Sequence, residues 1–117
     1  MILQSKDLEE KAVLEAAQKM CAAIRTAPKT KGDDFIRCCV VTGSEKEALA
    51  EEMERLSEKL GYGFFKRDAE NVRVSGAVVL AGISYQTRGL GGGCALCNRK
   101  DCAENAAEHG VCVYDPI

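Results

Sequence analysis

Apolar residues recur every three or four positions in two stretches of the chain, which is the spacing of one face of an α-helix. The first helix is predicted over residues 6–25, with Ser5 as its N-cap. The second is predicted to start at Ser44, which forms a capping box with Glu47. Gly61 follows the last apolar position of this helix, and we expect it to end the helix in a left-handed conformation.

Two other stretches have the composition of β-strands. Residues 35–42 are rich in β-branched and apolar side chains, and residues 76–83 form a continuous apolar run. Such a run predicts a strand buried on both faces. Between them we expect a short extended piece at 62–66 and a helical turn at 68–73. The order helix, strand, helix, strand predicts an α/β (α+β) fold in which two main helices pack on a small sheet.

The length of 117 residues suits one modest core with a small appended lobe. We predict an α/β body over residues 1–83 and a Cys-rich lobe over residues 84–117. Residues 84–93 are polar and rich in glycine, so they are expected to link the two. The domain boundary is therefore placed at the point where the apolar pattern stops.

One short helix is predicted inside the lobe. Asp101 and Glu104 have the spacing of a capping box, which places Cys102 at the first helical position. The helix is expected to run to about His109, with Gly110 as its stop. An imidazole at a helix C-terminus is electrostatically favourable, so His109 is interpreted as a helix-end residue in preference to a zinc ligand.

Charge and composition argue against several classes of partner. The chain has 16 Lys and Arg against 18 Asp and Glu, a net charge of −2, and no Trp. It therefore lacks both the basic surface and the aromatic platforms that nucleic acids use. The sequence has no apolar run of membrane-spanning length and no signal-peptide pattern. We therefore expect a cytoplasmic protein that binds neither nucleic acid nor membrane.

Seven cysteines, an odd number, do not suit a disulfide framework in a reducing compartment. Four of them stand close together in the order C-x2-C-x4-C-x9-C: Cys94, Cys97, Cys102 and Cys112. Thiolates are soft ligands that suit iron–sulfur clusters and zinc. Cys21, Cys38 and Cys39 lie in the first helix and strand and are expected to pack as small apolar side chains. The quartet is therefore the candidate metal site.

Two local features favour an anionic centre at this quartet. The predicted helix start at Cys102 would stabilise a thiolate, and glycines 91–93 allow backbone amides to approach sulfur. Ligand type and spacing favour an iron–sulfur cluster over structural zinc, with thiol redox chemistry as a third alternative. The C-x2-C-x4-C spacing with a later cysteine resembles the 4Fe-4S domains of electron-transfer and corrinoid iron–sulfur proteins. In those domains the fourth ligand lies further downstream than Cys112.

Several segments together with the quartet resemble the uncharacterised ferredoxin-domain-containing proteins of anaerobic bacteria and archaea. These segments are residues 10–14, 25–29, 31–32, 40–43 and 67–71. The resemblance covers nearly the whole chain and implies a 4Fe-4S cluster on the four cysteines. Members of that family continue beyond the position of Asp115 and Pro116, so this sequence is expected to be a fragment or a truncated variant.

The amino-terminal part is also similar to half of a nitroreductase, through its element order and an R-x-A-P loop from Arg25 to Pro28. This resemblance implies flavin mononucleotide near Arg25, Lys29 and Lys31. The same basic side chains also suit a solvated loop that binds no cofactor.

The sequence leads to three functional hypotheses. The first is a 4Fe-4S protein that transfers electrons, or serves as a redox accessory subunit, by docking on a redox partner protein. The second is a structural or interaction module stapled by zinc. The third is an FMN-dependent oxidoreductase subunit that forms a homodimer. No electron donor, acceptor, or catalytic acid or base can be identified from the sequence.

Overall fold

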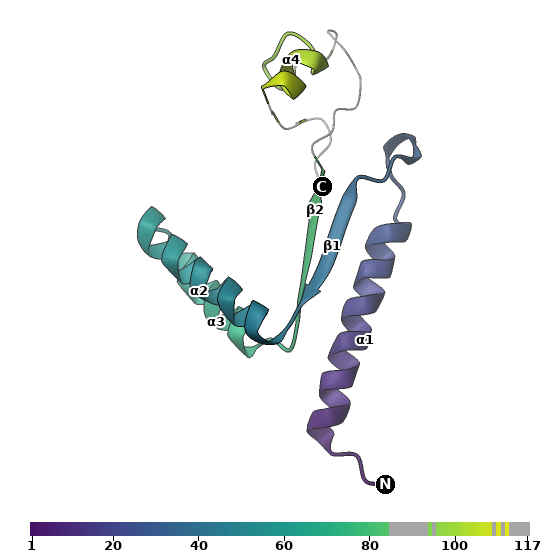
Figure 1. Cartoon of the computed structure of the whole chain (residues 1–117), viewed down its shortest axis with the longest axis vertical. Coiled ribbons are helices and arrows are strands. Elements are labelled where there is room, and N and C mark those ends of the chain that lie inside the picture. The colour runs from purple at the N-terminus through teal and green to yellow at the C-terminus, as the bar shows by residue number, and fades with distance from the viewer. Residues whose placement is uncertain (85–93, 95, 109, 111, 113–117) are drawn as a thin grey trace. The chain divides into compact units, whose positions relative to one another are not determined.

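The structure is a computed structural model that describes residues 1–84, 94, 96–108, 110 and 112 (Figure 1). These residues form a mixed α+β fold, which confirms the predicted class. The elements are α1 (Ser5–Thr26), the 3-10 turn η1 (Thr30–Gly32), β1 (Ile36–Val41), α2 (Gly43–Leu60), α3 (Gly63–Val74), β2 (Val78–Ile83) and α4 (Cys102–Ala107). The predicted linker at 84–93 lies outside the described residues except for Ser84.

The chain divides into two compact units. The first consists of residues 1–27 and 38–80, and the second consists of the described residues within 28–37 and 81–117. The first unit therefore holds α1, α2 and α3, and the second holds η1 and α4. The predicted boundary between residues 83 and 84 stays a prediction.

Strands β1 and β2 pair as a two-stranded antiparallel sheet, the only sheet in the described part of the chain. The pairing extends past the strand ends, where the Ser84 N–H donates to the Phe35 carbonyl at 3.0 Å. The prediction that β2 is buried on both faces is wrong, because Leu80 is 41% exposed and Ala81 is also exposed. Burial on both faces would require elements packed on each side of the sheet.

Helix α1 has nearly the predicted bounds, but its N-cap differs. The N-cap is Gln4, and Ser5 is already helical. The Ser5 hydroxyl donates instead to a Glu9 carboxylate oxygen at 2.7 Å. Along the predicted apolar stripe Ala17 is buried, whereas Met20 is 54% exposed. The apolar face of α1 is therefore only partly buried in the described structure.

Helices α2 and α3 form an antiparallel hairpin around a turn at Gly61. Gly61 adopts the predicted left-handed conformation, with φ of 73°. The predicted capping box is wrong: Thr42 is the N-cap, and the Ser44 hydroxyl donates to Glu45 at 2.9 Å. The Glu47 carboxylate accepts from Arg73 Nε at 2.6 Å instead.

Helix α3 is the element that differs most from the sequence-based prediction. It begins at Gly63, so the extended piece expected at 62–66 is wrong and the expected turn at 68–73 belongs to a longer helix. Ala50 of α2 and Ala69 of α3 are both fully buried. Small side chains at these positions allow the two helix backbones to approach closely.

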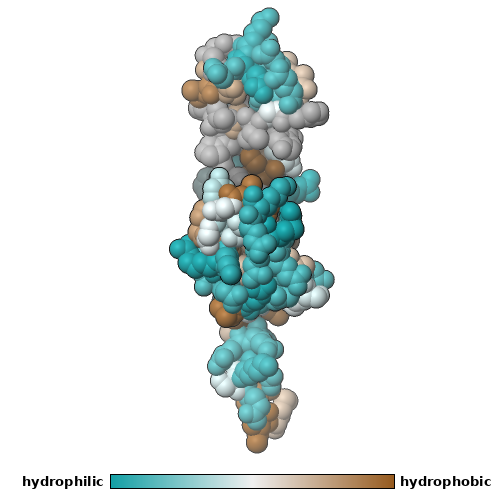
Figure 2. Space-filling model, turned by 90° about the vertical axis from the view of Figure 1, so that its left-hand side faces the viewer, coloured by the Kyte–Doolittle hydropathy of each residue, from teal (hydrophilic) through white to brown (hydrophobic). Residues whose placement is uncertain are grey.

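The buried core of the described residues is small. Its apolar members are Ala17, Ala50 and Ala69, and no large side chain there is fully buried. Most of the described surface that faces the viewer in Figure 2 is hydrophilic. Among the described helices, none combines the length and the apolar character needed to cross a bilayer.

Candidate metal centre

One of the predicted ligands lies at the start of α4. Asp101 is the N-cap, and its carboxylate accepts from the Glu104 N–H at 2.8 Å. The Glu104 carboxylate accepts in return from the Lys100 N–H at 2.6 Å. The predicted capping pair is therefore present. The Glu104 carboxylate accepts from the N–H of Lys100, one residue before the expected partner, Asp101. Cys102 is the first helical residue, as predicted.

After α4 the chain folds back onto this helix. The helix ends at Ala107, earlier than predicted, and His109 lies outside the described residues. The Gly110 N–H donates to the Asn105 carbonyl at 2.8 Å, and the buried Asn105 amide donates to the Gly110 carbonyl at 3.4 Å. A Cβ at Gly110 would lie 2.0 Å from Asn105 Oδ1, so this approach requires glycine. These contacts return the chain to α4 two residues before Cys112.

The segment before α4 holds the other two predicted ligands. Cys94 and Cys97 lie in turns, and Asn98 directly after them has a φ of 62°. This left-handed conformation is one that asparagine tolerates better than most residues. Arg99 forms an ion pair with Glu108, which connects this segment to the residue that follows α4. Residues 91–93, the predicted glycine approach to sulfur, lie outside the described part.

All four cysteines of the quartet are half-buried and none is in a disulfide. The described residues contain no group of three or more histidine, cysteine or carboxylate side chains placed to hold one metal ion. The structure therefore puts the four thiols in the same compact unit without gathering three of them. Their donor chemistry, four sulfur ligands, fits an iron–sulfur cluster or zinc. The ligand set remains a prediction.

The residues predicted for a flavin or phosphate lie around the end of α1. Arg25 is exposed in the last turn of α1. Lys29 is half-buried just before η1, and Lys31 is exposed within it with a φ of 58°. Arg25 belongs to the first unit, and the two lysines belong to the second. A flavin site at these residues stays a prediction.

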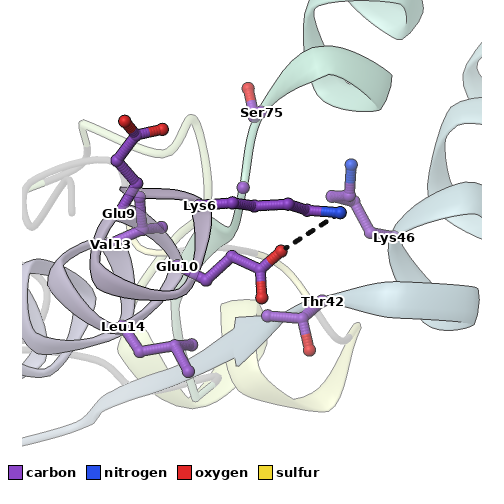
Figure 3. A pocket seen from close by; sticks show the side chains of 9 residues that line it. Lys6, Glu9, Glu10, Val13, Leu14, Thr42, Lys46 and Ser75 are labelled. Atoms are coloured by element: carbon purple, nitrogen blue, oxygen red, sulfur yellow. Dashed lines mark ion pairs between the residues drawn. The ribbon is translucent and has the colours of Figure 1, made fainter. Parts of the chain in front are cut away.

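A cavity of about 600 Å³ in the first unit was not predicted from the sequence (Figure 3). It is lined by α1, by the start of α2 and by the residues that follow α3. Lys6 and Glu10 form an ion pair across its wall at 3.9 Å. The Lys46 ammonium donates to the Val72 and Arg73 carbonyls at 3.0 and 2.6 Å. Each of the two lysines that line the cavity therefore interacts with oxygen acceptors.

A second unpredicted feature concerns a cysteine outside the quartet. Cys21 of α1 has a raised pKa, and Cys38 of β1 contributes to the shift. Burial raises the pKa of the Cys21 thiol, and the hydrogen bond with Cys38 and the charges of Cys38 and Cys39 raise this pKa further. Cys39 is exposed, so its predicted role as a packed apolar side chain is wrong. Only the register of α1 on β1 could have revealed this effect, and the sequence does not supply that register.

The comparisons with known proteins give one relative. Over 104 residues the chain is 41% identical to an uncharacterized protein of Archaeoglobus fulgidus. The match covers 89% of this chain and 55% of the relative, so the chain spans about half of the relative's length. No protein-family model matches the chain, and no solved structure matches it.

Proposed function

We propose that the protein binds a 4Fe-4S cluster through Cys94, Cys97, Cys102 and Cys112 and acts in electron transfer or as a redox accessory subunit. The observation that carries the proposal is the capped turn around α4. Asp101 fixes Cys102 at the helix start, and the Asn105–Gly110 contacts return the chain toward α4 just before Cys112. This arrangement supports Cys112 as the fourth ligand despite its short spacing.

The thiols are suited to take up such a centre. They are half-buried and outside disulfides, so they are accessible to an incoming cluster. Metal sites commonly become ordered only when the metal binds, because the binding free energy contributes to folding. A bound cluster would supply reversible one-electron chemistry, and the protein would tune its potential through burial and hydrogen bonds to sulfur. Seven reduced thiols suit a reducing cytoplasm and a redox partner protein.

The test is metal and sulfide analysis of protein purified without oxygen. We expect about four iron and about four sulfide per chain, as the 4Fe-4S formula requires. Replacing Cys94, Cys97, Cys102 or Cys112 singly by Ser should lower both contents and the charge-transfer absorbance. Cys39→Ser is the matched control, because Cys39 is an exposed cysteine of β1 and lies outside the quartet.

Two results would contradict the proposal. Stoichiometric zinc without sulfide would assign the quartet to a structural zinc site. Full iron and sulfide in Cys112→Ser would remove Cys112 from the ligand set and leave the fourth ligand to another residue. Aerobic preparations are unsuitable, because oxidation strips labile clusters and modifies the thiols.

A further inference from the structure

Strand β2 has the composition of an interior strand, although β1 is its only hydrogen-bonded neighbour in the described part of the chain. Its sequence, VVLAGI, includes no charged residue and no proline, and Leu80 is 41% exposed. Natural proteins protect a free strand edge with charged residues or proline, because unpaired N–H and C=O groups there pair with other chains. β1 carries the exposed Arg37, whereas β2 has no such protection. The free edge of β2 is therefore suited to pair with a further strand.

The register of the sheet determines which groups of β2 lie at this edge. Directly opposite residues of an antiparallel pair alternate between hydrogen-bonded and non-hydrogen-bonded pairs. The Ser84 N–H donates to the Phe35 carbonyl, so these two residues form a hydrogen-bonded pair. Two such steps back along β2, Leu80 also directs its N–H and C=O toward β1. The residues on either side of it, Val79 and Ala81, direct theirs toward the free edge.

The Archaeoglobus fulgidus relative indicates the source of such a strand. Its match covers 89% of this chain, so the match includes β2 wherever it begins. The same match covers only 55% of the relative, which leaves nearly half of that protein outside it. A region of that length is sufficient for several strands, since a typical strand has about 5–6 residues.

We propose that the free edge of β2 is a docking site for an uncharged, apolar β-strand of the region that the relative has outside the match. This strand exchanges main-chain hydrogen bonds with Val79 and Ala81, and β2 becomes an interior strand of the sheet. Side chains of the added strand pack beside Leu80 and lower its exposure. The proposal does not rest on the proposed cluster, because β2 contains none of the four cysteines.

Hydrogen exchange at residue resolution tests this proposal in two intact proteins, the present chain and the full-length relative. In this chain the Leu80 amide should exchange slowly because it is bonded to β1, whereas the Val79 and Ala81 amides should exchange fast. In the relative, the amides aligned with Val79 and Ala81 should exchange slower by about tenfold or more, because the added strand accepts hydrogen bonds from them. This protection should not change on dilution, since the added strand belongs to the same polypeptide of the relative.

Val79→Pro and Leu80→Pro are a matched pair of variants. Proline is tolerated where the N–H faces a free edge, but it disrupts a strand where the N–H is bonded to a neighbour. In this chain Val79→Pro should therefore lower the urea midpoint of unfolding less than Leu80→Pro does. In the relative, proline at the position aligned with either residue should lower the midpoint to a similar extent. Equal losses in the two variants of this chain would remove Val79 from the free edge and overturn the proposal.

Three exchange results would also overturn the proposal. Fast exchange in the relative at the positions aligned with Val79 and Ala81 would show that no strand covers the edge there. Slow exchange of Val79 and Ala81 in this chain would show that the edge is already paired. Protection in the relative that is lost on dilution would assign the edge to a second copy of the chain.

Discussion

Single residues set the turn between α2 and α3. Gly61 ends α2 with a φ of 73°, a conformation that places the Cβ of an L-residue too close to the following carbonyl. Gly63, two residues later, begins α3, and its φ does not lie in the left-handed region. An added Cβ at either position would meet no atom within 4 Å. The two glycines therefore differ in backbone conformation and not in available space.

Gly61→Ala should destabilise the protein by about 1 kcal/mol, because alanine must adopt the left-handed conformation. Gly63→Ala is the matched control and should leave the stability unchanged or raise it slightly, since alanine favours a helical position. Urea unfolding followed by circular dichroism measures both values. Equal losses in the two variants would show that the left-handed backbone is not the cause.

The structural role of a residue could be predicted from the sequence where one local rule decides it. Gly61 and Cys102 have their predicted roles, because a left-handed C-cap and an N-terminal cap involve only near neighbours. The capping box of Ser44 and Glu47 is absent because the helix begins one residue before Ser44, and the Glu47 carboxylate accepts instead from Arg73, 26 positions further along the chain. Spacing alone cannot show such a competitor.

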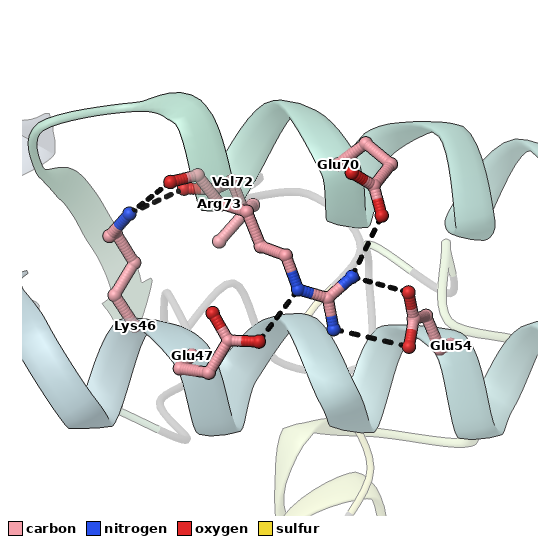
Figure 4. Close-up of polar contacts among 6 residues, drawn as sticks. All are labelled: Lys46, Glu47, Glu54, Glu70, Val72 and Arg73. Atoms are coloured by element: carbon pink, nitrogen blue, oxygen red, sulfur yellow. Dashed lines mark hydrogen bonds and ion pairs between the residues drawn. The ribbon is translucent and has the colours of Figure 1, made fainter.

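Helices α2 and α3 are joined by a cluster of charges centred on Arg73 (Figure 4). The guanidinium donates to Glu47 at 2.6 Å, to Glu70 at 2.9 Å and to both carboxylate oxygens of Glu54. The hydrogen bonds that Arg73 donates to Glu54 and Glu47 raise the pKa of Arg73, which keeps it charged. In turn, the hydrogen bond from Arg73 lowers the pKa of Glu54. The bidentate pair is the geometry in which an arginine–carboxylate contact is strongest.

This cluster predicts a pH dependence of stability. A carboxyl whose pKa is lowered by folding stabilises the protein above its ordinary pKa of 4.5, and this contribution is lost as the pH falls below that value. Glu54→Gln should therefore unfold at lower urea than the wild type at neutral pH, and the difference should shrink as the pH falls below 4.5.

The control is Glu58→Gln, which neutralises an exposed carboxylate on the same helix. This variant should follow the wild type more closely than Glu54→Gln does at both pH values. Urea unfolding curves of the three proteins, recorded at neutral and acidic pH, check the result. A Glu54→Gln deficit that is constant with pH would assign the effect to lost packing rather than to the ion pair.

Elements were predicted well where their own pattern is strong. The bounds of α1, β1 and α2 follow from apolar periodicity and β-branched composition. Helix α3 was missed in part because Gly63, Phe64 and Phe65 have weak helix propensity, and packing against α2 through Ala50 and Ala69 overrides it. The effect of Cys38 on the pKa of Cys21 was not predictable for a related reason: it depends on how one element lies on another.

For the whole molecule, the buried alanines all belong to the first unit, so the proposed metal centre would be a source of order in the second unit. The described residues bury no large apolar side chain completely, so burial alone contributes little there. The α2–α3 hairpin has its own support in Ala50, Ala69 and the Arg73 cluster. The proposed cluster, in contrast, would connect four chain positions around α4. The two units should therefore respond differently to loss of the metal.

Removal of the proposed cluster by an iron chelator under anaerobic conditions should loosen α4 and spare the α2–α3 hairpin. Hydrogen exchange with mass spectrometry measures this: peptides that cover residues 101–108 should exchange faster after chelation, while those that cover 47–74 should be unchanged. Cys39→Ser should behave as the wild type, and Cys102→Ser should already show fast exchange at α4 before chelation. Faster exchange in both regions would mean that the metal stabilises the whole chain, whereas no change at α4 would mean that the cluster is not bound around this helix.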